Sequence, residues 1–468
     1  MHRITARGGA LALALAALGV LASVARADAP DHSTTIARPA ADANAPKVPV
    51  SVSTLPNGLT LLLSEDHRLP VVSVEVRYLV GSSMERPGRS GFAHLFEHLM
   101  FQGSEHYDDE YFKPFEPVGG SVNGTTNQDR TNFFERVPSN YLELALWMES
   151  DRMQYLLPAL SQEKLDNQRE VVKNERRQSY ENRPYAMSWL YLQEALFPPS
   201  NPYHHPVIGS HADLSAATLG DVRAFFEEYY VPANAVLTIV GDFEAGAARK
   251  LVERYFGAIP AGKRATVPEA SVPPLERVVH ETKTDDVKLP RVYLAWPTPA
   301  LYHPGDAELD LLSSVLCSGK TSRLYLPLVY RDKLAKDVAA YQVSMRLASY
   351  YVVQATAAPG KSVDEVARAL LAELAKAAAT APSDDEMTRA KNGYEKSFFE
   401  RVEGVGSRAS LLAGYWQFTG DAGYLPQDLA RYTGATSAAV HAAMKRYLDL
   451  RHYVRLDIVP GTKPTENR

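Results

Sequence analysis

Two segments of the chain resemble each other, and this internal repeat restricts the possible architectures more than any other feature. Residues 217–242 read ATLGDVRAFFEEYYVPANAVLTIVGD, and residues 435–461 read ATSAAVHAAMKRYLDLRHYVRLDIVPG. Each copy has the pattern of a helix that runs into an apolar strand. The matched pairs, 218 or 219 positions apart, are Thr218 with Thr436, Val222 with Val440 and Val240 with Val459. Because the copies end two half-chains of nearly equal length, the repeat predicts a duplicated domain. The alternative is coincidence between two common helix-strand units.

Strand-like and helix-like patterns alternate in both halves. We therefore predict an α+β fold of two related α/β-sandwich domains, each with an antiparallel-rich sheet covered by helices. The expected domains are 48–260 and 281–468, joined by a Pro- and Ala-rich linker at 261–280. In the first domain, strands are expected at 57–66, 70–82, 121–127 and 131–137, and helices at 91–101, 108–118, 141–156, 162–180 and 185–196. In the second, a strand is expected at 291–297 and helices at 307–317 and 321–334.

The N-terminus has the pattern of a secretory signal peptide. Arg3 and Arg7 form a basic start, a Leu- and Ala-rich run follows, and residues 25–27 form an A-x-A cleavage site. We expect residues 1–27 to be removed, residues 28–47 to form a flexible leader, and the product to be periplasmic or secreted. The alternative is an uncleaved membrane anchor, but the apolar run barely spans a bilayer. Nothing later in the sequence resembles a membrane span.

The composition excludes several classes of protein. The chain is 45% hydrophobic and 22% charged, which is typical of a globular protein and excludes a fibrous or disordered one. A formal net charge of -5 gives no sequence-wide basic field, so we expect no nucleic-acid partner. The single cysteine, Cys317, cannot form an internal disulfide, so packing, alone or together with a metal, must hold an exported chain together.

One short motif carries chemistry. His94, Glu97 and His98 occur in the amphipathic segment GFAHLFEHLMF. Positions i, i+3 and i+4 share one helix face, so both imidazoles and the carboxylate point the same way. Two neutral histidines suit Zn²⁺, a third protein ligand leaves one position for water, and a nearby unligated carboxylate can take a proton from that water. The alternative is a surface helix with solvated or hydrogen-bonded histidines, but the apolar neighbours favour a buried helix.

The third ligand is expected on the helical stretch 162–182, which contains NERRQ after a hydrophobic pair. Together with the inverted HxxEH signature, this stretch resembles the pitrilysin/insulinase-type (M16) zinc metallopeptidases, including the mitochondrial processing-peptidase group. The resemblance implies a third ligand, a Glu, somewhat under eighty residues past the second His. Glu175 lies 77 residues past His98, so it is the implied third ligand of one Zn²⁺ per chain, with Glu97 as the catalytic base. Glu170 is the rival, on a different face of the helix.

The resemblance covers nearly the whole chain after the signal peptide, and it implies an endopeptidase that acts on peptides or unfolded segments. Residues 119–138, GGSVNGTTNQDRTNFFERVP, are similar to the family's edge strand, so Asn123 and Gly124 are implied to lie beside the bound peptide. The alternative for this segment is an ordinary hairpin. His204 and His205, in NPYHHPVIG, could suggest a second metal, but the flanking prolines favour a rigid structural turn.

Two positions depart from the family pattern. The family usually places a Glu seven residues before the third ligand, where this chain has Gln168, which can hydrogen-bond but brings no charge. In its second half the family has an Arg and, seven residues later, a Tyr that help bind substrate. Arg331 matches the Arg, but Val338 replaces the Tyr, and Tyr341 is three residues off register.

The second half has no HxxEH motif, and the chain has half the repeats of the long family members. The resemblance therefore implies a dimer. Val338 leads us to expect a heterodimer in which a related subunit supplies the Arg/Tyr pair, with a homodimer as the alternative. A non-catalytic peptide-binding or assembly subunit of the same fold is a second interpretation. A purely structural zinc site is a third, but such sites usually have four protein ligands and this chain has one thiol.

Overall fold

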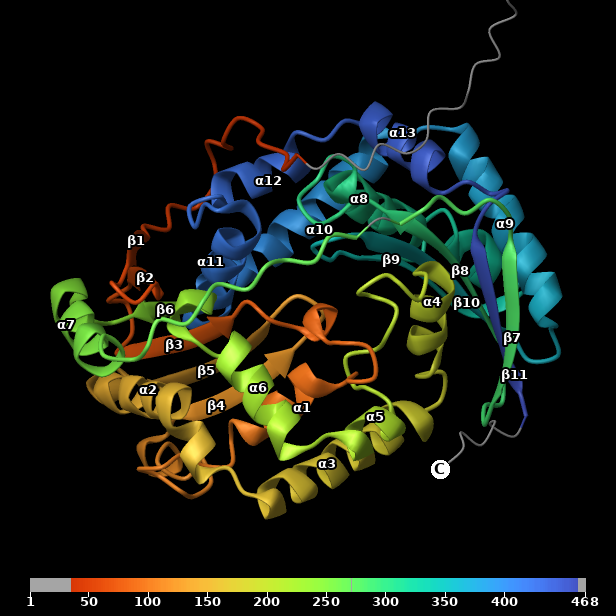
Figure 1. Cartoon of the computed structure of the whole chain (residues 1–468). Helices are drawn as coiled ribbons and strands as arrows, with labels where there is room; N and C mark the ends of the chain where they lie inside the picture. Colours follow the sequence, from red (N-terminus) through yellow and green to blue (C-terminus); the bar gives the residue numbers. More distant parts are fainter. Residues whose placement is uncertain (1–34, 271, 462–468) are drawn as a thin grey trace, which may run out of the picture. The chain divides into compact units, whose positions relative to one another are not determined.

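The computed structural model describes residues 35–270 and 272–461. Within these residues the strands form a six-stranded sheet in the first half and a five-stranded sheet in the second (Figure 1). In spatial order, the first sheet comprises β1 (Ser51–Thr54), β2 (Thr60–Glu65), β6 (Ala235–Gly241), β3 (Val71–Tyr78), β5 (Thr131–Pro138) and β4 (Ser121–Thr126). The second comprises β7 (Val279–Asp285), β11 (Val454–Pro460), β8 (Arg291–Thr298), β10 (Ser349–Ala357) and β9 (Ala335–Val343).

The two sheets share one topology. When β1 is left aside and the five strands of each sheet are counted in chain order, both sheets have the same spatial order: first, last, second, fourth and third. In each sheet the first and last of these strands pair in parallel, and the other pairs are antiparallel. The sequence repeat corresponds to α6 (Leu219–Tyr229) with β6 and to α13 (Ser437–Tyr447) with β11. The predicted duplicated α+β fold is therefore confirmed.

Each sheet is covered on one face by helices of its own half. The first sheet packs against α1 (Phe92–Leu99), α2 (Leu142–Ala159), α6 and α7 (Ala245–Phe256) in one apolar core. The second packs against α8 (Asp306–Cys317), α9 (Val363–Ala379) and α13 in another. Alternate strand residues supply these cores, as Phe133 and Val137 do in β5, because successive side chains of a strand point to opposite faces.

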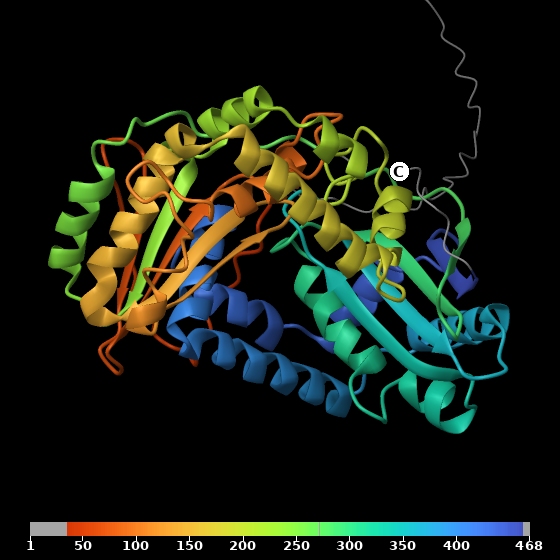
Figure 2. The same cartoon turned by 90° about the horizontal axis from the view of Figure 1, so that it is seen from below.

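The other face of each sheet is covered by a helix from the opposite half, and both halves belong to one compact unit. Helix α11 (Val405–Thr419) packs Ala409 and Leu412 against the first sheet. Helix α4 (Ser188–Leu196) packs Leu192 and Leu196 against the second. Figure 2 shows blue helices of the C-terminal half beneath the strands of the first sheet. Because each sheet needs a helix from the other half, the domain limits 48–260 and 281–468 remain predictions.

Two predicted helices are wrong. Residues 108–118 form turns and the short 3-10 helix Glu116–Val118, because Pro114 and Pro117 lack the amide hydrogens that a helix needs. Residues 321–334 form only a short π-helical turn, Leu326–Arg331, which has Pro327 at its start. The other predicted helices and strands are present, and their ends differ from the prediction by a few residues.

The N-terminal predictions are tested only in part. The predicted signal peptide, residues 1–27, and residues 28–34 of the leader lie outside the described residues. The rest of the predicted flexible leader is held in place, because the amide of Ala37 donates to Tyr302 O at 2.8 Å and that of Asp42 to Pro426 O at 3.0 Å. In the part of the chain that the structure describes, no helix is long and apolar enough to cross a bilayer.

Candidate metal centre

Two side chains of one helix and a third that is distant in sequence converge on one point. The Nε2 atoms of His94 and His98 lie 3.6 and 3.3 Å from Glu175 Oε2. One candidate ligand atom from each residue lies within 4.8 Å of the other two, and within residues 35–270 and 272–461 no other such group of His, Cys, Asp or Glu occurs. Bonds of about 2.0–2.1 Å in a tetrahedral site place ligand atoms roughly 3.3–3.5 Å apart. Two imidazoles and a carboxylate at this spacing therefore fit Zn²⁺.

Helix α1 presents the two histidines because its faces differ in polarity. Leu95, Phe96 and Leu99 are buried in the first core, and the ring of Phe96 stacks on that of Phe225 at 5.1 Å. The imidazoles of His94 and His98 occupy the remaining face, with side chains 12% and 21% exposed. Burial lowers the pKa of His94 to about 4, which keeps the imidazole neutral and able to bind a metal.

Helix α3 (Gln162–Arg176) supplies the carboxylate. Its N-terminus is capped by the Ser161 hydroxyl, and a π-helical turn, Arg177–Glu181, follows directly after its end. Glu175 is partly exposed, which leaves the centre open on this side. Gln168 is buried two turns earlier on the same face. The rival Glu170 is exposed and forms an ion pair with Lys173, so the structure brings Glu175 and not Glu170 to the histidines.

Glu97 lies beside this centre and is held by the edge strand. The hydroxyl of Thr126 donates a hydrogen bond to Glu97 Oε2 at 2.5 Å. Burial raises the pKa of Glu97, in the direction expected for a general base near neutral pH. A Cβ built on Gly124 would lie 3.1 Å from Glu97 Cγ and from the ring of Phe101, so a residue without a side chain fits here.

Strand β4 has an open edge beside Glu97. Within the described residues it pairs only with β5, and the next pair beyond the strand, Asn127 with Arg130, is hydrogen-bonded. Hydrogen-bonded and non-hydrogen-bonded pairs alternate along antiparallel strands, so Thr126 and Gly124 belong to non-hydrogen-bonded pairs. Their backbone N–H and C=O groups therefore point to the open edge. The Gly124 amide donates to Asn123 Oδ1 at 2.8 Å. Asn123 and Gly124 therefore lie where a peptide strand could pair.

Arg331, the predicted substrate residue of the second half, forms ion pairs within that half. The Arg331 guanidinium is exposed and pairs with Asp332 at 2.6 Å and with Glu373 at 3.6 Å. Val338 and Tyr341 lie on β9 but on opposite faces, as an odd spacing in a strand requires. Val338 is buried in the second core, whereas Tyr341 packs against Trp189 of α4 with ring centroids 5.5 Å apart. Tyr341 therefore cannot occupy the place of Val338.

Sequence reasoning missed residues that support the centre through long-range contacts. Thr126 lies within residues 119–138, but no local sequence pattern shows that its hydroxyl reaches Glu97. The buried Glu85 and the partly buried His205 are in contact at the start of α1, with 2.9 Å between His205 Nε2 and Glu85 Oε2. The prediction that His204 and His205 belong to a structural turn agrees with their hydrogen bonds to Phe197 O and Ser82 O.

Comparison with known proteins identifies the family of this chain. The description "Insulinase (Peptidase family M16)" matches residues 60–198, and "Peptidase M16 inactive domain" matches residues 216–394. The chain belongs to peptidase family M16. The first of these matches contains His94, Glu97, His98 and Glu175, and the second contains Arg331.

Several M16 relatives resemble the chain over most of its length. "Zinc protease PqqE" of Helicobacter pylori is 28% identical over 370 residues, which cover 77% of this chain and 82% of that protein. "Mitochondrial-processing peptidase subunit beta" of Blastocladiella emersonii is 23% identical over 378 residues, covering 78% and 79%. The crystal structure of a protease from Helicobacter pylori superposes with a TM-score of 0.82 at 25% identity, covering 88% of this chain and all of that one.

Proposed function

We propose that the chain is a zinc-dependent endopeptidase that hydrolyses peptides or unfolded segments. The observation that carries the proposal is the convergence of His94, His98 and Glu175 beside Glu97, next to the open edge of β4. The names of its M16 relatives, among them a zinc protease, support the same chemistry.

In this proposal His94, His98 and Glu175 hold one Zn²⁺. When bound there, the ion would supply Lewis acidity for the scissile carbonyl and for the attacking water. Glu97 accepts the proton of that water and then donates it to the leaving amine. Its hydrogen bond from Thr126 fixes the carboxylate for both transfers.

In this proposal, the substrate binds to strand β4. An extended peptide that pairs with its open edge forms main-chain hydrogen bonds with Gly124 and Thr126. To expose the Gly124 amide, the Asn123 side chain must release its hydrogen bond. Recognition through the main chain requires an extended substrate, which favours peptides and unfolded segments over folded proteins.

Zinc content and peptide hydrolysis test the proposal together. Chain that starts at Asp28 is purified, its zinc content is measured, and a set of quenched fluorescent peptides is assayed for wild type and for Glu97→Gln. We expect about one Zn²⁺ per chain and a chelator-sensitive activity that Glu97→Gln abolishes without loss of zinc. The absence of zinc would overturn the assignment of the metal centre.

A second candidate is a non-catalytic peptide-binding or assembly subunit. It is favoured by the description "Peptidase M16 inactive domain" for residues 216–394 and by Val338 at the place of the family's Tyr.

We further propose that a related subunit supplies the Arg/Tyr pair in a heterodimer located outside the cytoplasm. Zinc binding without activity, followed by activity when a partner subunit copurifies, would support the heterodimer. A fully active homodimer would rule it out.

A further inference from the structure

The loop of residues 201–211, which contains NPYHHPVIG, plays no part in the proposed chemistry but touches the elements that carry it. His205 Nε2 lies 2.9 Å from Glu85 Oε2 and 2.9 Å from Ser82 O. Since both neighbours are acceptors, Nε2 carries the proton and donates to them. The loop is thereby tied to the segment that leads into α1.

Glu85 in turn holds the first turn of α1. The helix begins after Gly91, which has no side chain to cap it. The Glu85 carboxylate instead accepts the Gly91 amide at 2.9 Å and the Ala93 amide at 2.8 Å. A carboxylate at a helix N-terminus satisfies free amides and interacts favourably with the helix dipole. Because the Glu85 side chain is fully buried, its charge needs the compensating hydrogen bond from His205.

The loop also packs directly on the start of α1 and on the end of α3. Gly91 and Gly209 both have positive φ, and a Cβ on Gly91 would lie 2.8 Å from Gly209 Cα. The Gly209 carbonyl accepts a hydrogen bond from Arg176 Nη1 at 2.7 Å, one residue after Glu175. One loop therefore contacts both helices whose side chains converge.

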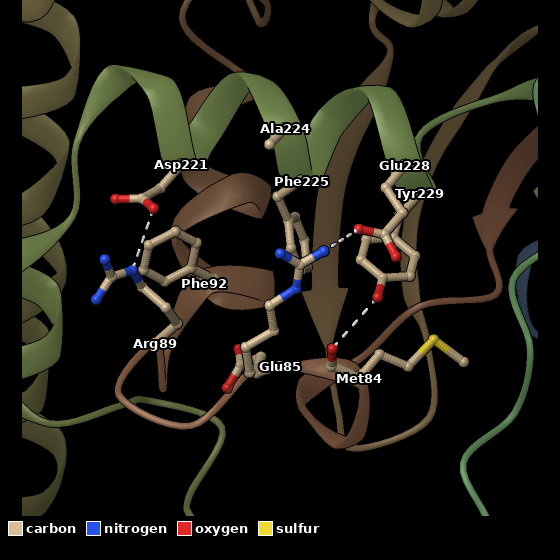
Figure 3. A pocket seen from close by; sticks show the side chains of 10 residues that line it. Met84, Glu85, Arg89, Phe92, Asp221, Ala224, Phe225, Glu228 and Tyr229 are labelled. Carbon is tan, nitrogen blue, oxygen red and sulfur yellow. Dashed lines mark hydrogen bonds and ion pairs between the residues drawn. The ribbon is translucent and has the colours of Figure 1, made fainter.

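The opposite side of the segment before α1 is held less firmly. There the segment faces α6 across a cavity of about 60 Å³ (Figure 3). Arg86 pairs with Glu228 at 2.9 Å and Arg89 with Asp221 at 3.3 Å, and all four side chains are at least 30% exposed. Exposed ion pairs contribute little free energy, whereas the Glu85 carboxylate that contacts the partly exposed His205 is itself fully buried. We therefore attribute the position of the segment mainly to the contact between Glu85 and His205.

We propose that Glu85 and His205 are positioning residues of the metal centre. The contact between the buried Glu85 carboxylate and the His205 imidazole fixes where α1 begins, and thereby the direction of His94 and His98 relative to Glu175. This inference rests on the proposed function, because it concerns the same three ligands.

Zinc affinity and hydrogen exchange test the inference in the full chain. Dissociation constants for Zn²⁺ are measured by competition with a chelator, and the absorption of the Co²⁺-substituted protein reports ligand geometry. We expect His205→Ala to weaken zinc binding by about tenfold and to alter the Co²⁺ spectrum. His205→Gln should recover most of the affinity, because its amide restores a donor near the position of Nε2.

Two matched controls come from the same region. His204→Ala removes the neighbouring imidazole, whose Nδ1 contacts Phe197 O at 2.7 Å, and Arg86→Gln removes the exposed ion pair. Both should leave zinc affinity within about twofold of wild type. Equal effects of His204→Ala and His205→Ala, or no effect of either, would overturn the inference. If His205→Ala does not fold, Glu85→Gln is measured in its place.

Hydrogen exchange separates this inference from the proposed function. In metal-free protein, His205→Ala should speed exchange of the α1 amides while His204→Ala does not. If wild type binds no zinc, the proposed function fails, yet faster exchange in His205→Ala alone still supports a positioning role for the pair. Unchanged exchange in α1 counts against that role whatever the metal content.

Discussion

The hydroxyl of Thr126 donates a 2.5 Å hydrogen bond to Glu97 Oε2, and so joins the open edge strand to the helix that carries the candidate metal ligands. Thr126→Val removes this bond with little change in shape. We expect kcat/KM for peptide hydrolysis to fall by about tenfold while zinc content stays at the wild-type level. Thr126→Ser keeps the hydroxyl and should retain most of the activity. Equal activity of the Val and Ser variants would show that the bond is irrelevant to catalysis.

Gly124 is placed where any side chain would press on Glu97. Gly124→Ala puts a Cβ 3.1 Å from Glu97 Cγ and from the Phe101 ring, so these side chains must shift by a few tenths of an ångström. We expect a fall in kcat of about three- to tenfold, since small displacements of a catalytic group are costly. Gly246→Ala, which meets no atom within 4 Å, is the control and should leave kcat unchanged.

Glu175 and Glu170 offer a matched pair on one helix. Glu175→Gln removes the charge of the proposed third ligand and should weaken zinc binding by about a hundredfold. Glu170→Gln makes the same chemical change five residues earlier, at an exposed residue paired with Lys173, and should change zinc affinity by less than about twofold. Titration with a chelator measures both. If Glu170→Gln lost more zinc affinity than Glu175→Gln, Glu170 and not Glu175 would be the third ligand.

A partly buried ion pair in the second half predicts a pH-dependent stability. The Arg323 guanidinium donates two 2.7 Å hydrogen bonds to Glu386 and lowers the pKa of this carboxyl to about 2. Since the folded pKa lies below the unfolded value of about 4.3, the stabilisation is complete above that value and is lost as pH falls toward 2. Glu386→Gln should cost about 2 kcal/mol at pH 7 and progressively less below pH 4.

Urea unfolding at pH 7 and pH 3 measures this difference. Glu400→Gln is the control, because Glu400 forms an exposed pair with Lys396 on the same helix, α10 (Asp384–Glu403). It should change the free energy of unfolding by less than about 0.5 kcal/mol at either pH. A Glu386→Gln effect that is the same at both pH values would contradict the assigned ionisation.

The sequence alone predicted those parts of the protein that depend on local periodicity. The HxxEH spacing places His94, Glu97 and His98 on one face of a helix, and the helix observed at Phe92–Leu99 presents them in this way. The repeat of a helix followed by an apolar strand predicted the duplication, which the shared strand order confirms. Prediction failed at residues 108–118 and 321–334, where prolines interrupt an otherwise helical pattern.

Only the tertiary structure decided how distant segments meet. The choice between Glu175 and Glu170 depends on which face of α3 lies against α1. The hydrogen bond from Thr126 to Glu97 and the contact between Glu85 and His205 join residues 29 and 120 positions apart. The packing of α4 against the second sheet and of α11 against the first is equally non-local. A local pattern fixes which side chains share a face, whereas packing of the whole chain fixes what each face meets.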